Sequence, residues 1–310
     1  MKSSKFQRLG IGNSLNMPRW LLWSLVALLS WGVWAILSKM IGHALSAAHS
    51  QALSTVGLVP VMVALGFSRR LSATGNRLRG TLCAFAAGVL GCAGNIAYYH
   101  ALNRGGKAAT VVPLTALYPL VTIALAAVLL KEKLNRIQIV GALLSLTAIY
   151  LFNVSSAEGL LSSGLAYALA PIAFWGVAGL LQKACTNHIS GELSTLWFLS
   201  AFIPVAVLIL WRESLPPRIA PGVWLLVAVL GLFLGLGNFA LLAACASAGK
   251  ASIVIPLTAL YPAVSVPIAI LFLGEKVGTR ESVGILLALA SVIALSHESP
   301  PATENSLSPH

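Results

Sequence analysis

Charged residues are scarce in this 310-residue chain, and aspartate is missing altogether. Only 9% of the residues are charged and 58% are apolar, whereas soluble globular proteins have about 25% charged and about 45–50% apolar residues. So little charge cannot cover a water-facing surface, which excludes a soluble enzyme of ordinary design. The eight acidic residues are all glutamates. This excludes sites that need an aspartate nucleophile, an aspartate-bound metal or an aspartate proton relay.

Motifs for common chemistries are missing as well. The four cysteines lie in or beside apolar runs without a CxxC or Cys/His cluster, so we expect neither a disulfide framework nor a zinc site. The sequence contains no GxxxxGK[ST] element, no HExxH motif, no nucleophile elbow and no TVGYG-type filter. We therefore expect no enzymatic activity, no cofactor, no metal and no selective channel.

Long apolar runs are what the sequence has in abundance. A transmembrane helix needs about 20 predominantly apolar residues, and ten segments qualify, joined by short connections that carry most of the charges. The first segment exceeds the roughly 7–15 apolar residues of a signal peptide, so we expect it to stay in the membrane. The expected spans cover residues 20–40, 48–67, 80–101, 108–130, 136–152, 159–182, 194–211, 222–246, 251–274 and 282–296.

The two halves of the chain repeat one another. Residues 107–119 read KAATVVPLTALYP and residues 250–262 read KASIVIPLTALYP, which is an offset of 143. The same offset carries the Gly-Asn pair at 94–95 onto 237–238 and the Glu-Lys pair at 132–133 onto 275–276. An offset of 144 carries Trp31 onto Trp175 and Lys39 onto Lys183. The chain is thus a duplicated unit of five spans.

An odd number of spans fixes the relation between the copies. The second copy enters the membrane from the opposite side, and such inverted repeats are typical of secondary transporters with a substrate site near the midplane. We predict an all-α integral membrane protein with ten transmembrane helices as two inverted five-helix repeats. The expected parts are an N-terminal tail (1–19), a first repeat (20–153), a second repeat (154–297) and a C-terminal tail (298–310).

Positive charge is concentrated in the first half. Residues 1–153 contain 14 Lys/Arg and one Glu, whereas residues 154–310 contain six and seven. These charges fall between apolar runs rather than on one helix face, so we interpret them as a topology signal and expect no nucleic-acid partner. Cytoplasmic loops collect Lys and Arg. We therefore expect a multi-pass protein of the cell inner membrane with both termini in the cytoplasm.

Ten spans, two five-helix repeats and a proline-rich helix followed by Glu-Lys resemble the EamA branch of the drug/metabolite transporter superfamily. The resemblance covers residues 20–297 and implies alternating access through a central cavity, with outward export in bacterial members. Relatives include exporters of amino acids and other metabolites, nucleotide-sugar carriers and organellar phosphate antiporters. Anionic phosphates are disfavoured here, because no cation can be placed deep in the membrane.

Several duplicated polar or aromatic residues at membrane depth are candidates for the substrate cavity. Prolines within spans free backbone carbonyls, and such helices are tolerated where they face protein or a wet cavity. Asparagine amides in lipid must be hydrogen-bonded, and tryptophan rings beside glycine offer stacking surfaces. The expected cavity residues are Trp31, Asn95, Tyr99, Thr115, Tyr118, Trp175, Asn238, Thr258 and Tyr261, and the expected helix breaks are at Pro113, Pro119, Pro256 and Pro262.

Each candidate also has a purely structural interpretation. The prolines can be packing kinks, the asparagines can hold helices together, and the tryptophans can simply pack. Tyr98, Tyr99 and His100 lack aromatic counterparts in the second half and can belong to an interfacial belt.

Charged residues at the ends of spans provide a gating hypothesis. The predicted topology brings Lys39 and Glu275 to the outer face, and Lys183 and Glu132 to the inner face. Each pair would close the gate on its own face, and the two gates would open alternately. The alternative is ordinary snorkelling of these side chains to the interface.

The sequence thus predicts a secondary transporter that exports small, uncharged or zwitterionic metabolites such as amino acids. The alternatives are efflux of hydrophobic drugs or cations, and a membrane receptor or scaffold that binds without transport. Expected partners are a small-molecule substrate and the lipid bilayer, and the expected state is a monomer or weak homodimer. Energy coupling stays open between facilitated or exchange-type export and proton antiport through a histidine or a terminal glutamate.

Overall fold

The computed structural model describes residues 17–129, 134–153, 163–247 and 251–297. These residues form α-helices and no strand apart from one isolated bridge between Ala73 and Ile189, as the sequence predicts. The helices of the first half are α1 (Arg19–Ile41), α2 (Ala47–Gly66), α3 (Arg77–Asn103), α4 (Ala108–Thr115), α5 (Pro119–Leu129) and α6 (Arg136–Asn153). Those of the second half are α7 (Ser163–Thr186), α8 (Gly191–Ser200), α9 (Phe202–Arg212), α10 (Pro221–Ala246), α11 (Ala251–Thr258), α12 (Pro262–Phe272) and α13 (Thr279–Leu295).

Many of these helices are apolar and long enough to cross a bilayer. Seven segments of the described chain meet that length and composition: α1, α2, α3 and α10 alone, and the stretches formed by α4 with α5, α8 with α9, and α11 with α12. Helix α6 is apolar but shorter. The protein is therefore a multi-pass membrane protein.

Short polar side chains cap the N-terminal ends of several helices. Ser46 accepts a hydrogen bond from the backbone N–H of His49 at the start of α2, and Asn76 accepts one from Arg79 at the start of α3. Ser190 does the same for α8. Such caps satisfy backbone N–H groups that have no partner within the helix, and they set where each apolar segment starts.

The repeated prolines divide two of the apolar stretches into helix pairs. Pro119 begins α5 and Pro262 begins α12, whereas Pro113 and Pro256 lie inside α4 and α11. Pro119 has no N–H for the carbonyl of Thr115, and that carbonyl accepts from the N–H of Tyr118 instead, at 3.2 Å. The freed carbonyl is thus hydrogen-bonded within the turn itself. The helix break directs the side chain of Tyr118 toward the centre of the molecule.

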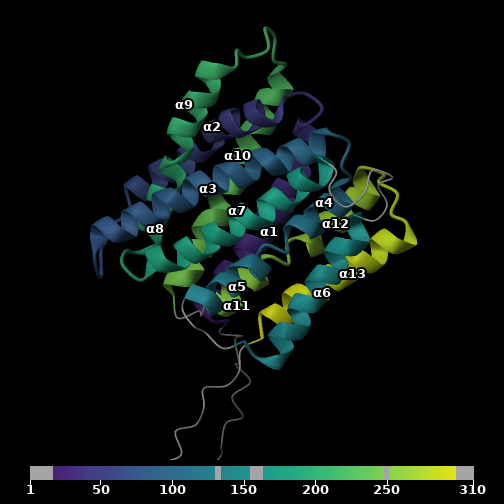
Figure 1. The fold of residues 1–310 in the computed structure, drawn as a ribbon. Helices are drawn as coiled ribbons and strands as arrows, with labels where there is room; N and C mark the ends of the chain where they lie inside the picture. The colour runs from purple at the N-terminus through teal and green to yellow at the C-terminus, as the bar shows by residue number, and fades with distance from the viewer. Residues whose placement is uncertain (1–16, 130–133, 154–162, 248–250, 298–310) are drawn as a thin grey trace, which may run out of the picture.

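The first helix of each half packs against the long helix that forms the third apolar segment of the other half. Helix α1 lies along α10, and α7 lies along α3 (Figure 1). Glycines on α1 and α7 also let α12 and α5 of the other half approach closely, because a Cβ on Gly32 would lie 2.7 Å from the Cβ of Val264 in α12 and one on Gly176 would lie 2.5 Å from the Cβ of Val121 in α5. The two halves therefore interlock, and the centre of the molecule is built from both.

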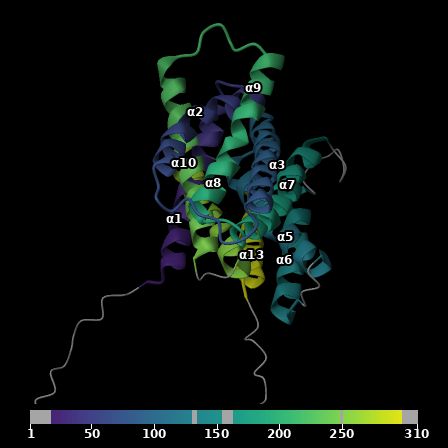
Figure 2. The same ribbon diagram turned by 90° about the vertical axis from the view of Figure 1, so that its left-hand side faces the viewer.

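The last helices of the two halves form one edge of the bundle. Helices α6 and α13 pack side by side (Figure 1), and the hydroxyls of Ser145 and Ser291 form a hydrogen bond between them. The opposite end of the molecule, formed by the connection between α9 and α10, projects beyond the other helices (Figure 2). The central helices α1, α3, α7 and α10 lie between these regions and enclose the cavity described next.

Candidate functional site

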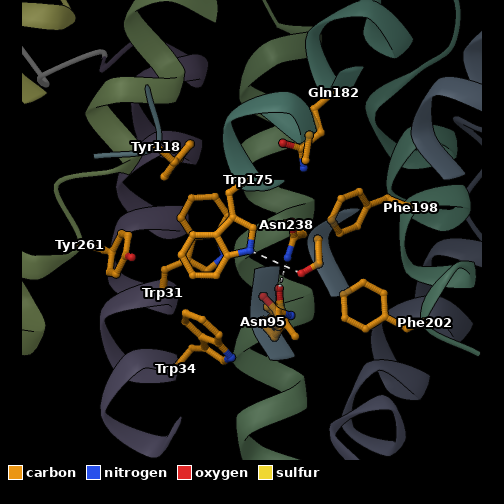
Figure 3. Close-up of a pocket in the computed structure, with 13 residues that line it drawn as sticks. Trp31, Trp34, Asn95, Tyr118, Trp175, Gln182, Phe198, Phe202, Asn238 and Tyr261 are labelled. Carbon is orange, nitrogen blue, oxygen red and sulfur yellow. Dashed lines mark hydrogen bonds between the residues drawn. The ribbon is translucent and has the colours of Figure 1, made fainter. Parts of the chain in front are cut away.

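A cavity of about 60 Å³ lies between the central helices (Figure 3). A buried water needs about 10–15 Å³ on this measure, so the space holds about four to six waters or a small organic group. Rings and amides dominate its wall, and none of the described residues that line it carries a formal charge. The lining residues are Trp31, Trp34, Gly91, Asn95, Tyr118, Trp175, Ala178, Gln182, Phe198, Phe202, Leu234, Asn238 and Tyr261.

Most of the wall consists of residues that occupy equivalent places in the two halves. With the offsets of 143 and 144, ten of the lining residues form five pairs: Trp31 with Trp175, Trp34 with Ala178, Gly91 with Leu234, Asn95 with Asn238, and Tyr118 with Tyr261. Only Gln182, Phe198 and Phe202 come from the second half alone. The two halves therefore share the cavity, except for one part of its wall that the second half alone provides.

Two tryptophan–tyrosine pairs repeat the same geometry. The ring centroids of Trp175 and Tyr118 are 6.2 Å apart at an interplanar angle of 88°, and those of Trp31 and Tyr261 are 6.2 Å apart at 78°. Edge-to-face arrangements of this kind are favourable for aromatic rings. The duplication predicted by the sequence thus reappears in the ring geometry of the cavity.

Glycines allow these tryptophan rings to pack closely against a helix of the other half. A Cβ on Gly94 would lie 3.1 Å from Cε2 of Trp175, and one on Gly237 would lie 3.2 Å from Cε2 of Trp31, with other ring atoms nearer still. The indole N–H of Trp175 also donates to the carbonyl of Gly91 at 3.4 Å. The glycine before each asparagine is therefore needed to let the ring approach.

The two asparagines are equivalent in sequence but differ in hydrogen bonding. The side-chain amide of Asn238 donates to the carbonyl of Leu234 at 2.8 Å, within its own helix. The amide nitrogen of Asn95 is buried and has no hydrogen-bond partner within the described residues. An unpaired buried donor costs about 1–3 kcal/mol, so Asn95 provides a donor that a bound acceptor would satisfy.

The structure brings six of the nine predicted cavity residues to the wall: Trp31, Asn95, Tyr118, Trp175, Asn238 and Tyr261. Thr115 and Thr258 lie behind it, where their hydroxyls donate to the carbonyls of Val112 and Ile255. Tyr99 lies one layer further out, and its hydroxyl accepts from the indole N–H of Trp34 at 3.2 Å. These three residues support the cavity and do not line it.

Other lining residues were not predicted from the sequence. Trp34 is one of them, and its counterpart in the second half is the small Ala178. Phe198, Phe202 and Gln182 carry no repeat signal, because Ser54, Leu58 and Ser38 stand at the equivalent places in the first half. The only available signal is the position of Gln182 one helical turn from Ala178, on the face of α7 that contains Trp175.

The predicted outer gate residues converge on one short segment, residues 105–109, which leads into α4 and includes its first two residues. The ammonium of Lys39 donates to the carbonyl of Gly106 at 2.7 Å. The carboxylate of Glu275 accepts from the backbone N–H groups of Ala108 and Ala109 at 2.8 and 2.7 Å, at the start of α4. Within the described residues Lys39 and Glu275 contact this segment and form no ion pair with each other.

The predicted inner gate is only partly within the described structure. Lys183 lies in the last turn of α7, and Glu132 lies outside the described residues. The inner pair therefore stays a prediction.

Comparisons with known proteins agree with this architecture. The model of the "EamA-like transporter family" matches residues 18–154 and again residues 162–297. A solved structure titled only "Crystal structure of protein" superposes with a TM-score of 0.67 at 18% identity, covering 90% of this chain and 97% of that one. This likeness concerns the fold alone.

A curated relative, an uncharacterized protein of Methanocaldococcus jannaschii, is 38% identical over 73 residues. That match covers 24% of this chain and 53% of the relative, so the chain spans about half the length of the curated relative that it matches. The family model, in contrast, matches nearly the whole chain in two copies. This protein belongs to the EamA-like transporter family.

Proposed function

We propose that this protein is a secondary transporter that exports small, uncharged or zwitterionic metabolites such as amino acids by alternating access. In this proposal ten spans form two inverted five-helix repeats in the cell inner membrane, with both termini in the cytoplasm, and the protein works as a monomer or weak homodimer. The observation that carries the proposal is the cavity whose wall is built from equivalent residues of both halves. A site shared by two interlocked repeats changes its accessible side when the repeats tilt against each other.

The chemistry of the wall supports a substrate with an apolar body and a few polar groups. Seven aromatic rings provide stacking surface, and the amides of Asn95, Asn238 and Gln182 provide hydrogen-bonding groups. The unpaired amide nitrogen of Asn95 can donate to a substrate carboxylate or carbonyl, and an ammonium group is attracted to the faces of the rings. An aromatic wall without a fixed charge fits a zwitterion better than an anion.

Efflux of a hydrophobic cation is the second candidate, favoured by the same aromatic wall. The two candidates respond differently to a negative charge in the cavity. Replacement of Asn95 by aspartate keeps the shape and adds a carboxylate among rings. We expect binding of a zwitterionic amino acid to weaken at least tenfold, because its carboxylate then faces a like charge and loses a donor.

The Asn95→Asp protein is compared with Asn95→Ala and with the wild type by ligand-induced thermal shift, using amino acids and tetraphenylphosphonium as probes. A cation substrate predicts the reverse pattern, with tetraphenylphosphonium binding tightened by aspartate and amino acids inert in all three proteins. That pattern would replace the first candidate with the second.

We further propose that Lys39 and Glu275 hold the outer end of the cavity closed through the 105–109 segment, and that Lys183 and Glu132 act at the inner end. Charge reversal by Glu275→Lys places a cation against two backbone N–H groups at a helix start, which is unfavourable. We expect the outer end to stay open and transport to fall several-fold, measured as initial uptake rates in proteoliposomes. Glu132→Lys tests the inner end in the same way, and unchanged rates for either variant would remove that pair from the proposal.

Substrate-dependent flux tests the proposed function itself. A thermal-shift panel of amino acids and related metabolites on the purified protein identifies a ligand, and the labelled ligand is then offered to proteoliposomes. We expect uptake that saturates with concentration and is lost in protein-free vesicles. Binding without uptake would instead identify a receptor or scaffold.

A further inference from the structure

Two phenylalanines dominate the part of the cavity wall that the second half alone provides. Phe198 lies in the last turn of α8 and Phe202 begins α9, and their ring centroids are 5.8 Å apart. Figure 3 shows both rings on one side of the cavity, away from Tyr261. The equivalent residues of the first half, Ser54 and Leu58, have smaller side chains and do not line the cavity. The two rings therefore narrow the cavity from one side only.

Close packing against α3 fixes the backbone that carries these rings. Ala201 joins α8 to α9, and its N–H donates to the carbonyl of Phe198 at 3.3 Å. A Cβ on Gly88 of α3 would lie 2.7 Å from the Cβ of Ala201 and closer still to the carbonyl of Phe198. Both phenylalanines are buried. The rings therefore cannot move far back from the cavity unless α3 separates from the α8–α9 junction.

The ring of Phe198 lies close to the unpaired donor of the cavity. A Cβ on Gly91 would lie 3.0 Å from Cζ of Phe198. Gly91 and Asn95 both line the cavity and are four residues apart in α3, which places them one helical turn from each other on the same face. A substrate carboxylate that accepts from the free amide nitrogen of Asn95 therefore has the edge of the Phe198 ring beside its remaining atoms.

We propose that Phe198 and Phe202 determine specificity by limiting the substrate to small amino acids such as glycine and alanine. This inference rests on the proposed transport function and adds the size of the substrate. The cavity of about 60 Å³ holds about four to six waters, and therefore a molecule with about as many non-hydrogen atoms. Glycine and alanine are of this size. The longer side chain of norleucine would press against two rings whose backbone is fixed, and such overpacking is unfavourable.

A series of amino acids with straight side chains of increasing length tests the inference. Glycine, alanine, 2-aminobutyrate, norvaline and norleucine are compared by the concentration dependence of the thermal shift. We expect the wild-type protein to bind alanine about tenfold or more tightly than norleucine, because the longer chain overpacks the cavity. In Phe198→Ala and Phe202→Ala the order should reverse, because each methylene buried in the freed space strengthens binding by about fourfold. Phe198→Leu should give an intermediate result.

Phe174→Ala is the matched control. Phe174 lies in α7, is exposed on the outside of the bundle and does not line the cavity, so this variant should keep the wild-type order of affinities. The readout is a ratio of two affinities within one protein, which a general loss of stability does not reverse. If an alanine variant shows no cooperative unfolding, Phe198→Leu provides the comparison, because leucine keeps the site apolar and removes less volume.

Two outcomes overturn the inference in distinguishable ways. If the wild-type protein binds norleucine as tightly as alanine, or if the phenylalanine variants keep the wild-type order, the two rings do not limit substrate size. Export of amino acids then still stands, because members of the series bind. If no amino acid of the series stabilises the wild-type protein or any variant, the proposed substrate class fails together with the inference.

Discussion

Substrate binding is expected to weaken about tenfold or more when Trp175 is replaced by leucine. The ring of Trp175 lies at the centre of the aromatic wall, with centroids 5.6 Å from Tyr98, 6.0 Å from Trp34 and 6.2 Å from Tyr118. Leucine keeps the helix apolar but removes the stacking surface and the indole N–H that donates to Gly91. One aromatic contact contributes about 0.5–1.5 kcal/mol beyond its buried area, and the loss of area adds to this.

The matched control is Trp224→Leu, because Trp224 is 40% exposed and lies outside the cavity wall. Affinity is obtained from the concentration dependence of the thermal shift with the amino acid that stabilises the wild-type protein most. Equal affinity in the Trp175→Leu and Trp224→Leu proteins would contradict the assignment of Trp175 to the substrate site.

Replacement of Gly231 by alanine is expected to destabilise the fold by about 1–3 kcal/mol or more, the usual cost of overpacking. A Cβ at Gly231 would lie 2.8 Å from the Cα of Gly57 and closer still to the carbonyl of Ser54. Both neighbours are backbone of α2, which cannot rotate away as a flexible side chain would. The helices α2 and α10 must therefore separate, although alanine favours a helix over glycine by about 1 kcal/mol.

Gly222→Ala is the control in the same helix, because a Cβ there meets nothing within 4 Å. The measurement is the thermal unfolding midpoint of both variants in the same detergent. We expect a clear decrease for Gly231→Ala and no decrease for Gly222→Ala, and similar midpoints for the two would show that α2 and α10 do not approach this closely.

The duplication explains which residues of the site could be predicted from the sequence. Trp31, Asn95 and Tyr118 could be selected because each recurs in the second half at a fixed offset, and a costly feature repeated at membrane depth indicates a shared centre. The same criterion selects Thr115 and Thr258, although the proline turn directs the neighbouring tyrosines inward and leaves both hydroxyls bonded to their own helices.

Recurrence in both halves cannot identify the part of the cavity wall that the second half alone provides. Phe198 and Phe202 reach the cavity from α8 and α9, and their counterparts Ser54 and Leu58 do not. Which of these side chains reach the cavity depends on how the helices pack, and a single sequence does not show that packing. In the same way Lys39 and Glu275 could be assigned to one end, but their partners are backbone groups of the 105–109 segment. A search for oppositely charged side chains cannot reveal such partners.

The most direct test of the central claim is counterflow in proteoliposomes without a pH gradient. Vesicles loaded with the unlabelled amino acid identified by thermal shift are diluted into a trace of the labelled compound. The account predicts transient accumulation of label by the wild-type protein and strongly reduced accumulation by the Trp175→Leu protein. Ligand binding without accumulation in the wild-type protein, with or without a gradient, would contradict transport through the shared cavity.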